Sequence, residues 1–216
     1  MNKITFDNVV PQVFQHTEDL YSDVWSGLVE FEKGKLYLVE AESGKGKSTF
    51  CSYILGYRHD YSGTIRFDGR DIRDYSVGDW VGVRQHNISH LFQELRLFPE
   101  LTAMENVQIK RNLTAVSHAS EEQIKTWFDL LGIGDKLDVK IARMSFGQQQ
   151  RVAMLRALVQ PFDFLLVDEP ISHLDDNNSR IMGEIMMEEA RRQGAAVIVT
   201  SIGKHMDLPY DTIVRL

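Results

Sequence analysis

Continuous apolar runs in this sequence predict strands that are covered on both faces. Such runs occupy residues 36–39, 164–167 and 195–200, and each begins directly after a glycine or a charged residue. Residues 80–93 carry a more broken apolar pattern, which we interpret as a further buried strand that ends at Gln93. Near-continuous apolar runs are typical of parallel strands with helices on both faces. The pattern therefore predicts a mixed or parallel sheet in an α/β protein.

Two segments in the first third of the chain alternate apolar and polar residues instead, which is the pattern of a half-buried strand. Residues 2–10 predict an edge strand. Residues 63–69 end in an Asp-Gly pair, which is a typical hairpin turn. We therefore expect a separate antiparallel β subdomain.

From Pro99 onward the apolar residues recur at helical spacing. Thr102 and Glu105 have the spacing of a capping box at the start of a helix. Ser120 and Gln123 repeat this pattern before a second, amphipathic stretch. The region is therefore predicted to be helical in an otherwise α/β chain.

The predicted elements divide the chain into a core and an insert. We expect one domain over all 216 residues, with a core of about 1–93 and 147–216 and a helical subdomain of about 94–146. Further helices are expected over 149–159 and 178–192.

A loop of small and charged residues joins the apolar strand at 36–39 to the helix expected from Phe50. It has the layout of a phosphate-binding loop, in which backbone N–H groups and the helix N-terminus surround an anion. Lys47 would bridge the β- and γ-phosphates, and the Ser48 hydroxyl would ligate Mg²⁺. The residues predicted to hold the nucleotide are Ser43, Gly44, Lys45, Gly46, Lys47, Ser48 and Thr49.

Two residues of this loop depart from the usual pattern. Ala41 stands where the pattern has its first glycine, which costs energy if the backbone there needs a positive φ. Lys45 adds a second cation beside the phosphates. The alternative interpretation is a lysine-rich turn between a strand and a helix.

Two acidic residues that follow the apolar run at 164–167 are candidates for the second half of a nucleotide-binding site. Asp168 would hold Mg²⁺, and Glu169 would act as the general base toward an attacking water. An acidic pair at a strand end is by itself more often simply solvated. Together with the phosphate-binding loop it predicts hydrolysis of a nucleoside triphosphate.

Composition narrows the class of protein. The 216 residues are 43% hydrophobic, with no apolar run near the ~20 residues of a membrane span and no signal-peptide pattern at the start. The single cysteine, Cys51, fits a reducing compartment and is interpreted as a small buried residue. The net charge of −7, with no basic block, argues against nucleic acid as a partner. A cytoplasmic protein is expected.

Taken in order, these motifs resemble those of the nucleotide-binding subunits of ATP-binding cassette (ABC) transporters, over essentially the whole chain. Gln93 matches the glutamine of the family's Q-loop. The segment Ser145-Phe146-Gly147-Gln148 is similar to the signature motif, Asp168-Glu169-Pro170 to the Walker B end, and Ser172-His173-Leu174-Asp175 to the D-loop. The resemblance implies a P-loop NTPase core with mixed or parallel sheet, an antiparallel β subdomain and a helical insert.

The resemblance also implies a mechanism and partners. Two cassettes, expected to be identical chains, would pair head to tail and bury two ATP molecules between them. Each γ-phosphate would meet Lys47 of one subunit and Ser145, Gly147 and Gln148 of the other. Gln93 would ligate Mg²⁺ and take part in catalysis beside Glu169.

One aromatic residue is expected to stack on the nucleotide base. Phe14 is the candidate that we favour, and Tyr21 is the other. The alternative for each is plain packing, since aromatic side chains fill cores more often than they hold ligands.

Three departures from the family pattern, at Ala41, Phe146 and Ser201, together predict slow basal hydrolysis. Phe146 replaces a signature glycine, and Ser201 stands where the family has its switch histidine. A serine has neither the charge nor the reach of an imidazole. His205 and His173 are weak substitutes, and His205 is expected to be a surface residue.

The membrane partner is expected to be a separate permease chain, which would place the protein on the inner face of the cell membrane. Residues 92–102 are where such cassettes usually receive the permease. Residues 97–107 are similar to a stretch of the lipoprotein-release, macrolide-export and cell-division group, and also of amino-acid importers. The alternatives are a nucleotide-gated binding module with negligible hydrolysis and a soluble, non-transport ABC protein.

Overall fold

A parallel sheet of five strands forms the centre of the molecule, in the order β6-β7-β8-β3-β9. The computed structural model describes residues 1–17, 21–42, 44–114, 118–170, 175–203 and 205–216. The strands are β3 (Leu36–Glu40), β6 (Ile88–Leu91), β7 (Phe164–Asp168), β8 (Ala196–Ser201) and β9 (Thr212–Arg215). The apolar runs therefore predicted the central strands correctly.

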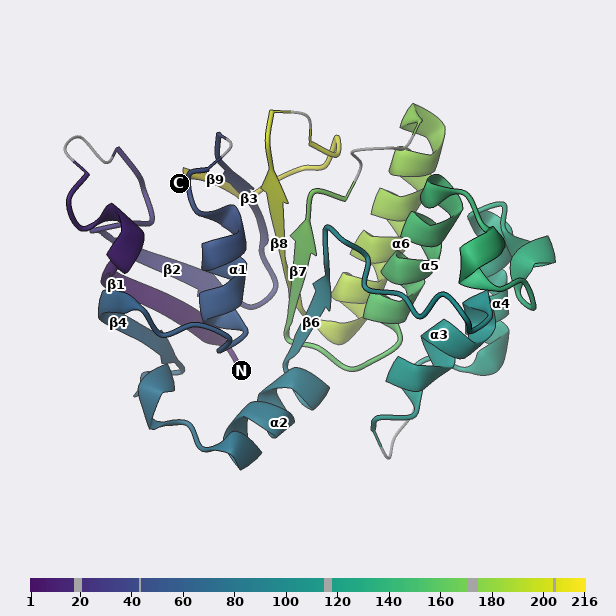
Figure 1. Ribbon diagram of the computed structural model, residues 1–216, viewed down its shortest axis with the longest axis horizontal. Coiled ribbons are helices and arrows are strands. Elements are labelled where there is room, and N and C mark those ends of the chain that lie inside the picture. The colour runs from purple at the N-terminus through teal and green to yellow at the C-terminus, as the bar shows by residue number, and fades with distance from the viewer. Residues whose placement is uncertain (18–20, 43, 115–117, 171–174, 204) are drawn as a thin grey trace.

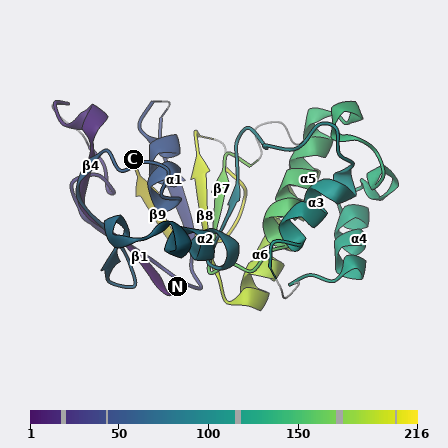
Figure 2. The ribbon, with the colours of Figure 1, turned by 60° about the horizontal axis from the view of Figure 1, so that its bottom comes forward.

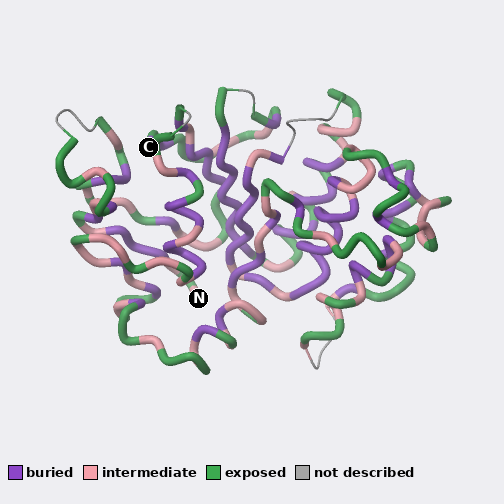
Figure 3. Tube along the Cα trace, in the orientation of Figure 1, coloured by how far each residue is buried: buried purple, intermediate pink, exposed green. Residues whose placement is uncertain are grey.

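Alternate residues of these strands pack into two separate cores, one on each face of the sheet. Leu165 and Val167 of β7 join one core, and Leu166 joins the other. Helix α1 (Lys47–Ile54) covers the second face, whereas α5 (Phe146–Leu158) and α6 (Asp176–Gln193) cover the first. Figures 1 and 2 both show α1 and α5 on opposite sides of β7 and β8. Figure 3 shows the buried residues running along these strands, because both faces are covered.

The antiparallel sheet has the order β2-β1-β4-β5. Its strands are β1 (Lys3–Pro11), β2 (Leu28–Glu32), β4 (Tyr61–Phe67) and β5 (Arg70–Asp71). The expected hairpin is confirmed, and its turn residues Asp68 and Gly69 have φ values of 49° and 87°. The expectation of an edge strand over residues 2–10 is wrong, because β1 pairs with both β2 and β4. An alternating pattern indicates that one face of a strand is buried, but it does not indicate how many strands pair with it.

The prediction of one long strand over residues 80–93 is also wrong. Its first part is helix α2 (Val77–His86), which Ser76 and Asp79 begin with a reciprocal capping box. Trp80 and Val83 are its buried apolar residues, three positions apart on one face. The strand itself, β6, ends at Leu91, two residues before Gln93.

Helices occupy most of the segment between β6 and α5. Thr102 and Glu105 cap α3 (Ala103–Arg111) as predicted, and the Ser120 hydroxyl accepts from the backbone of Gln123 at the start of α4 (Glu121–Leu130). Both helices pack on α5, at the end of the molecule far from the antiparallel sheet (Figure 1).

The remaining helical turns are short 3-10 segments, at Gln12–Phe14, Ile72–Asp74, Gly134–Lys136 and Ile141–Arg143. Helices α5 and α6 begin a few residues earlier than predicted, because Ser145 and Asp175 act as their N-caps. Within the described ranges, no helix has the length and apolar character needed to cross a membrane.

Candidate nucleotide-binding site

The loop between β3 and α1 has the backbone that a phosphate-binding loop requires. Gly44 and Gly46 have φ values of 82° and 99°, which glycine adopts at little cost. Gly46 is the N-cap of α1, so Lys47 is the first residue of that helix. A Cβ atom on Gly46 would lie 3.1 Å from the ring of Phe14, so the loop is also closely covered at this point.

Ala41 does not carry the strain that its departure from the usual glycine suggested. It is not among the described residues with positive φ. Its backbone N–H donates to the carbonyl oxygen of Ser201 at 3.1 Å, which continues the pairing of β3 with β8. The alanine is therefore compatible with this loop.

Three of the predicted catalytic side chains meet at the carboxyl ends of the parallel strands. The Lys47 ammonium lies 3.4 Å from Oε1 of Glu169, and both side chains are largely buried. The Gln93 side-chain amide donates to Oε2 of the same carboxylate at 3.2 Å. Glu169 has a φ of 48°, which is uncommon for a residue other than glycine and is typical of functional sites. Ligands of α/β sheets bind at this edge.

Asp168 is the last residue of β7 and is buried beside this cluster. Burial raises the pKa of its carboxyl group, and the hydrogen bond from the Thr200 hydroxyl opposes that rise. A desolvated carboxylate of this kind is suited to a cation. Ser48 is exposed at the start of α1, and the Gln93 amide nitrogen faces Glu169, which leaves its Oε1 for an ion. Hydroxyl, carboxylate and amide oxygens are the hard donors that Mg²⁺ prefers, so the residues present fit this ion.

The aromatic candidates occupy different environments. Phe14 is half-buried and lies against the loop at Gly46. Tyr21 is 87% exposed. Trp25, which the sequence did not single out, is fully buried and donates from its indole N–H to the carbonyl oxygen of Lys45 at 3.3 Å. Of the two candidates, Phe14 is therefore the one that lies against the loop, whereas Trp25 is buried beneath it.

The other loop residues are placed as follows. Lys45 is exposed, and Thr49 is buried with its hydroxyl accepting from Arg58 at 3.0 Å. Ser43 lies outside the described residues, as do Ser172, His173 and Leu174 of the D-loop segment. The last residue of that segment, Asp175, caps α6.

The signature-like segment lies at the N-terminus of α5. The Ser145 hydroxyl accepts from the backbone N–H of Gln148, and the Gln148 side chain accepts from the N–H of Ser145. Ser145 is exposed, Gly147 is half-buried, and Phe146 presents 44% of its surface to solvent. Because α1 and α5 cover opposite faces of the sheet, one chain does not bring this segment to Lys47 (Figure 2).

Two buried residues of α5 link it to the site, and the sequence pattern did not indicate either. Gln150 donates a hydrogen bond of 2.5 Å to the carbonyl oxygen of Pro170, directly after Glu169. Arg156 donates to the carbonyl oxygens of Leu95 and Arg96, at 2.5 and 2.6 Å. In the sequence, the only indication of these two contacts was a polar residue on an otherwise apolar face of the helix.

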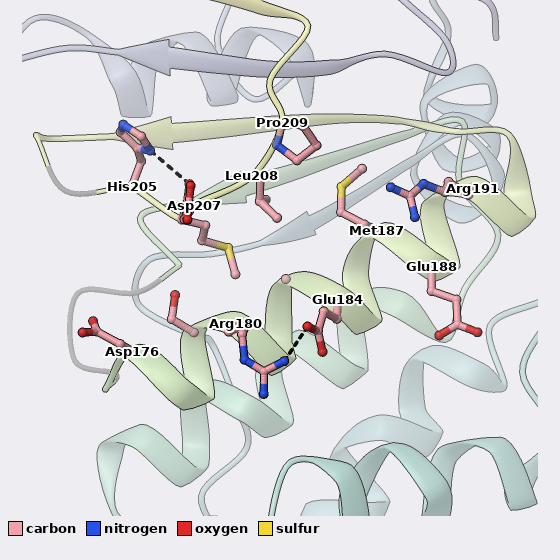
Figure 4. A pocket seen from close by; sticks show the side chains of 13 residues that line it. Asp176, Arg180, Glu184, Met187, Glu188, Arg191, His205, Asp207, Leu208 and Pro209 are labelled. Atoms are coloured by element: carbon pink, nitrogen blue, oxygen red, sulfur yellow. Dashed lines mark hydrogen bonds and ion pairs between the residues drawn. The ribbon is translucent and has the colours of Figure 1, made fainter.

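His205, the histidine substitute that the structure describes, lies away from the cluster of Lys47, Gln93 and Glu169. Ser201 is the buried last residue of β8 and pairs with Glu40. His205 is exposed, as expected, and lines a separate groove of about 850 Å³ between α6 and residues 205–209 (Figure 4). Its Nδ1 lies 3.0 Å from the carbonyl oxygen of Met206.

Comparison with known proteins identifies the family. The family model described as "ABC transporter" matches residues 28–172, and the chain belongs to this family. The lipoprotein-releasing system ATP-binding protein LolD of Syntrophus aciditrophicus (strain SB) is 32% identical over 181 residues, which are 83% of this chain and 81% of that protein. The macrolide export ATP-binding/permease protein MacB of Shewanella sp. (strain ANA-3) is 28% identical over 85% of this chain and 28% of its own length.

Solved structures agree with this assignment. The dimeric structure of MJ0796, a bacterial ABC transporter cassette, is 26% identical with a TM-score of 0.75, covering 92% of this chain and 87% of that chain. A post-hydrolysis dimer of the same cassette bound to ADP and phosphate is 25% identical, with the same TM-score and the same coverage. The predicted fold class is thereby confirmed. This protein is an ABC-family ATPase of the kind that forms the ATP-binding subunit of a transporter.

Proposed function

We propose that two copies of this chain hydrolyse Mg-ATP at their shared interface and thereby move a separate membrane permease. The observation that carries the proposal is the cluster at the strand ends, where Lys47, Gln93 and Glu169 lie within 3.4 Å of their partners beside the buried Asp168. Similar relatives are the ATP-binding protein of a lipoprotein-releasing system and a macrolide export ATP-binding/permease protein. No nucleic acid partner is part of this proposal.

Each residue of the cluster has its own role in binding the nucleotide or in the reaction. Lys47 leaves Glu169 and binds the β- and γ-phosphates, together with backbone N–H groups of the loop and the N-terminus of α1. Glu169 then holds the attacking water and takes its proton. When bound, Mg²⁺ would neutralise charge on the phosphates. Ser48, Asp168 and Gln93 are the residues proposed to hold it.

A second copy completes the site. Ser145, Gly147 and Gln148 lie at the start of α5, where the positive end of the helix dipole favours an anion. They cannot serve Lys47 of their own chain, because α1 lies on the opposite face of the sheet. Head-to-tail pairing of identical chains would bring them together, and the dimeric cassette structure that resembles this chain supports this arrangement.

The permease would dock on the surface around Phe98, on the inner side of the membrane. Phe98 is 51% exposed although it is large and apolar. The buried side chain of Asn106 accepts from its N–H at 2.8 Å and donates to its carbonyl oxygen at 3.1 Å, so the residue is held outward in a fixed position. An exposed aromatic residue on a rigid loop is typical of an interface anchor.

A capture experiment tests the partner. The Glu169→Gln protein with Mg-ATP, which holds the closed dimer, is used to capture partners from detergent-solubilised native membranes. We expect a polytopic membrane protein to co-purify, and the yield to fall with an added Phe98→Ala change. Exposed Val77 on α2 provides the matched control, since Val77→Ala should leave the yield unchanged. Recovery of only soluble proteins, ribosomes or DNA would contradict the permease assignment.

A second candidate function is a nucleotide-gated binding module in which ATP closes the dimer and hydrolysis is negligible. The observation that favours it is Ser201, which is buried at the end of β8 where the family has a histidine. Steady-state phosphate release separates the two functions. Turnover that disappears with Glu169→Gln supports the ATPase. The absence of turnover in the unaltered protein, with ATP-dependent dimerisation intact, supports the binding module.

A further inference from the structure

Behind the proposed magnesium position, three side chains with metal-binding atoms meet inside the protein. They are Cys51 of α1, His90 of β6 and Asp168 of β7, and their ligand atoms all lie within 4.8 Å of one another. The alternation of side chains along a strand explains why His90 and Asp168 lie on the same face of the sheet. His90 pairs with Leu166, whose side chain belongs to the core on the α1 face, and Asp168 follows two residues later on the same face.

His90 is the unusual member of this group. Both of its ring nitrogens are fully buried, and neither has a hydrogen-bond partner among the described residues. A buried polar group without a partner costs about 1–3 kcal/mol, so native proteins rarely keep one without a use for it. The ring packs against Phe92, with 4.0 Å between the ring centroids. Its nitrogens lie beside the Cys51 thiol and the Asp168 carboxylate and bond to neither.

The three donors form a set suited to a particular class of cation. A thiolate, an imidazole and a carboxylate favour zinc and similar borderline transition metals over Mg²⁺, which prefers oxygen alone. Ligand atoms of a tetrahedral zinc site lie roughly 3.3–3.6 Å apart, from bond lengths of about 2.0–2.3 Å. The ligand atoms therefore have to move closer together by at most about 1.5 Å to bind such an ion. Three protein ligands leave the fourth position to water.

We propose that Cys51, His90 and Asp168 form a regulatory site for a zinc-class transition metal ion. Binding releases the thiol proton of Cys51 to solvent and forms a metal–thiolate bond. The inhibitory part of the proposal rests on the proposed function, because Asp168 would serve both ions. A carboxylate drawn toward Cys51 and His90 is withdrawn from Mg²⁺, so the transition metal lowers ATP hydrolysis.

Cobalt(II) is the direct probe of this site. It substitutes for zinc, and a cobalt–thiolate bond absorbs in the near ultraviolet by charge transfer. The chain has one cysteine, so such a band can come only from Cys51. We expect a saturable band with one Co²⁺ per chain, which added Zn²⁺ abolishes by displacement. No band at a tenfold excess of Co²⁺ over the full-length protein would overturn the proposal.

Substitutions test the other ligands. Cys51→Ser should lose the band, and His90→Phe should weaken Co²⁺ binding by at least about tenfold, since one of three ligands is gone. His205→Phe is the matched control, because His205 is exposed and lines a different groove, and it should bind Co²⁺ like the unaltered chain. Thermal melting and ATP binding establish that each variant folds, and Cys51→Ala serves if Cys51→Ser does not. A band of full strength in folded His90→Phe would overturn the site.

Measurements of ATP hydrolysis distinguish a failure of the metal site from a failure of the proposed function. Zn²⁺ at micromolar concentration should inhibit phosphate release by the unaltered chain, and Cys51→Ala and His90→Phe should be resistant while keeping their activity without Zn²⁺. A cobalt band without inhibition by Zn²⁺ would support the metal site but overturn its regulatory role. A chain that shows the cobalt band but no ATP turnover would contradict the proposed function alone. Turnover without any band would contradict the metal site alone.

Discussion

The ammonium group of Lys47 lies 3.4 Å from the carboxylate of Glu169, and these side chains are only 8% and 14% exposed. The pair joins the cation proposed for the phosphates to the carboxylate proposed as the base. A phosphate chain has to compete with Glu169 for Lys47, and the competition frees the carboxylate to meet water. We therefore propose that binding of the substrate and release of the base are one event.

Replacement of Glu169 by glutamine should abolish phosphate release. The amide keeps the size of the side chain but cannot accept the proton of the attacking water, so we expect a loss of at least about 10²-fold. ATP binding should persist, and size-exclusion chromatography should show a dimer that remains closed with ATP. Glu188→Gln, at an exposed residue of α6, is the matched control and should keep the activity. Turnover that survives in Glu169→Gln would mean that another group is the base.

Replacement of Ser201 by histidine should raise the rate. Ser201 ends β8 opposite Glu40, where an imidazole would extend past the strand end toward the phosphates. We expect kcat to increase by about tenfold or more, in line with the contribution of a positioned polar group. Ser201→Asn supplies a similar bulk without the charge and should leave kcat low. Equal rates for both variants and the unaltered chain would show that the histidine is not limiting.

Arg156 should stabilise the loop on which the permease is proposed to dock. Its guanidinium holds the carbonyls of Leu95 and Arg96, two consecutive residues with φ values of 58° and 49°. A lysine ammonium cannot reproduce this fork, so Arg156→Lys should lower the free energy of unfolding by about 1–3 kcal/mol. Urea denaturation measures the change. Arg180→Lys, in an exposed ion pair on α6, should change it by less than about 0.5 kcal/mol, and an equal effect would refute the role.

Lys110 predicts how stability depends on alkaline pH. Burial, with Arg156 nearby, lowers the pKa of Lys110 from 10.5 to about 8. Between about pH 8 and 10.5 the unfolded chain therefore binds more protons at this residue than the folded chain does. The contribution of Lys110 to stability is fully unfavourable below pH 8 and becomes less unfavourable as the pH rises to 10.5, by roughly 3 kcal/mol in all.

Comparison of variants isolates this effect from the other groups that titrate in the same window. Lys110→Met should remove the rise, so its free energy of unfolding should increase less from pH 8 to 10 than that of the unaltered chain. Lys140→Met, at a more exposed lysine, should keep the rise. Parallel curves for Lys110→Met and the unaltered chain would contradict the lowered pKa.

The sequence by itself determined the elements whose signals are local. Apolar runs identified β3, β7 and β8 because both faces of these strands are buried, and the capping residues Thr102 and Ser120 located α3 and α4. The phosphate-binding loop and the Asp168-Glu169 pair were recognisable because they follow apolar strands directly. All the carboxyl ends of a parallel sheet lie at one edge, so these motifs had to meet there.

Only the tertiary structure decided what depends on neighbours distant in the chain. Pairing with both β2 and β4 placed β1 inside its sheet, and one-sided burial of Trp80 and Val83 made residues 77–86 a helix. Ala41 proved compatible with its loop because φ is set by the whole turn. The contacts of Arg156 and the meeting of Cys51 with His90 join separate elements. Such contacts leave no periodic trace in a sequence, because they arise from how the layers stack.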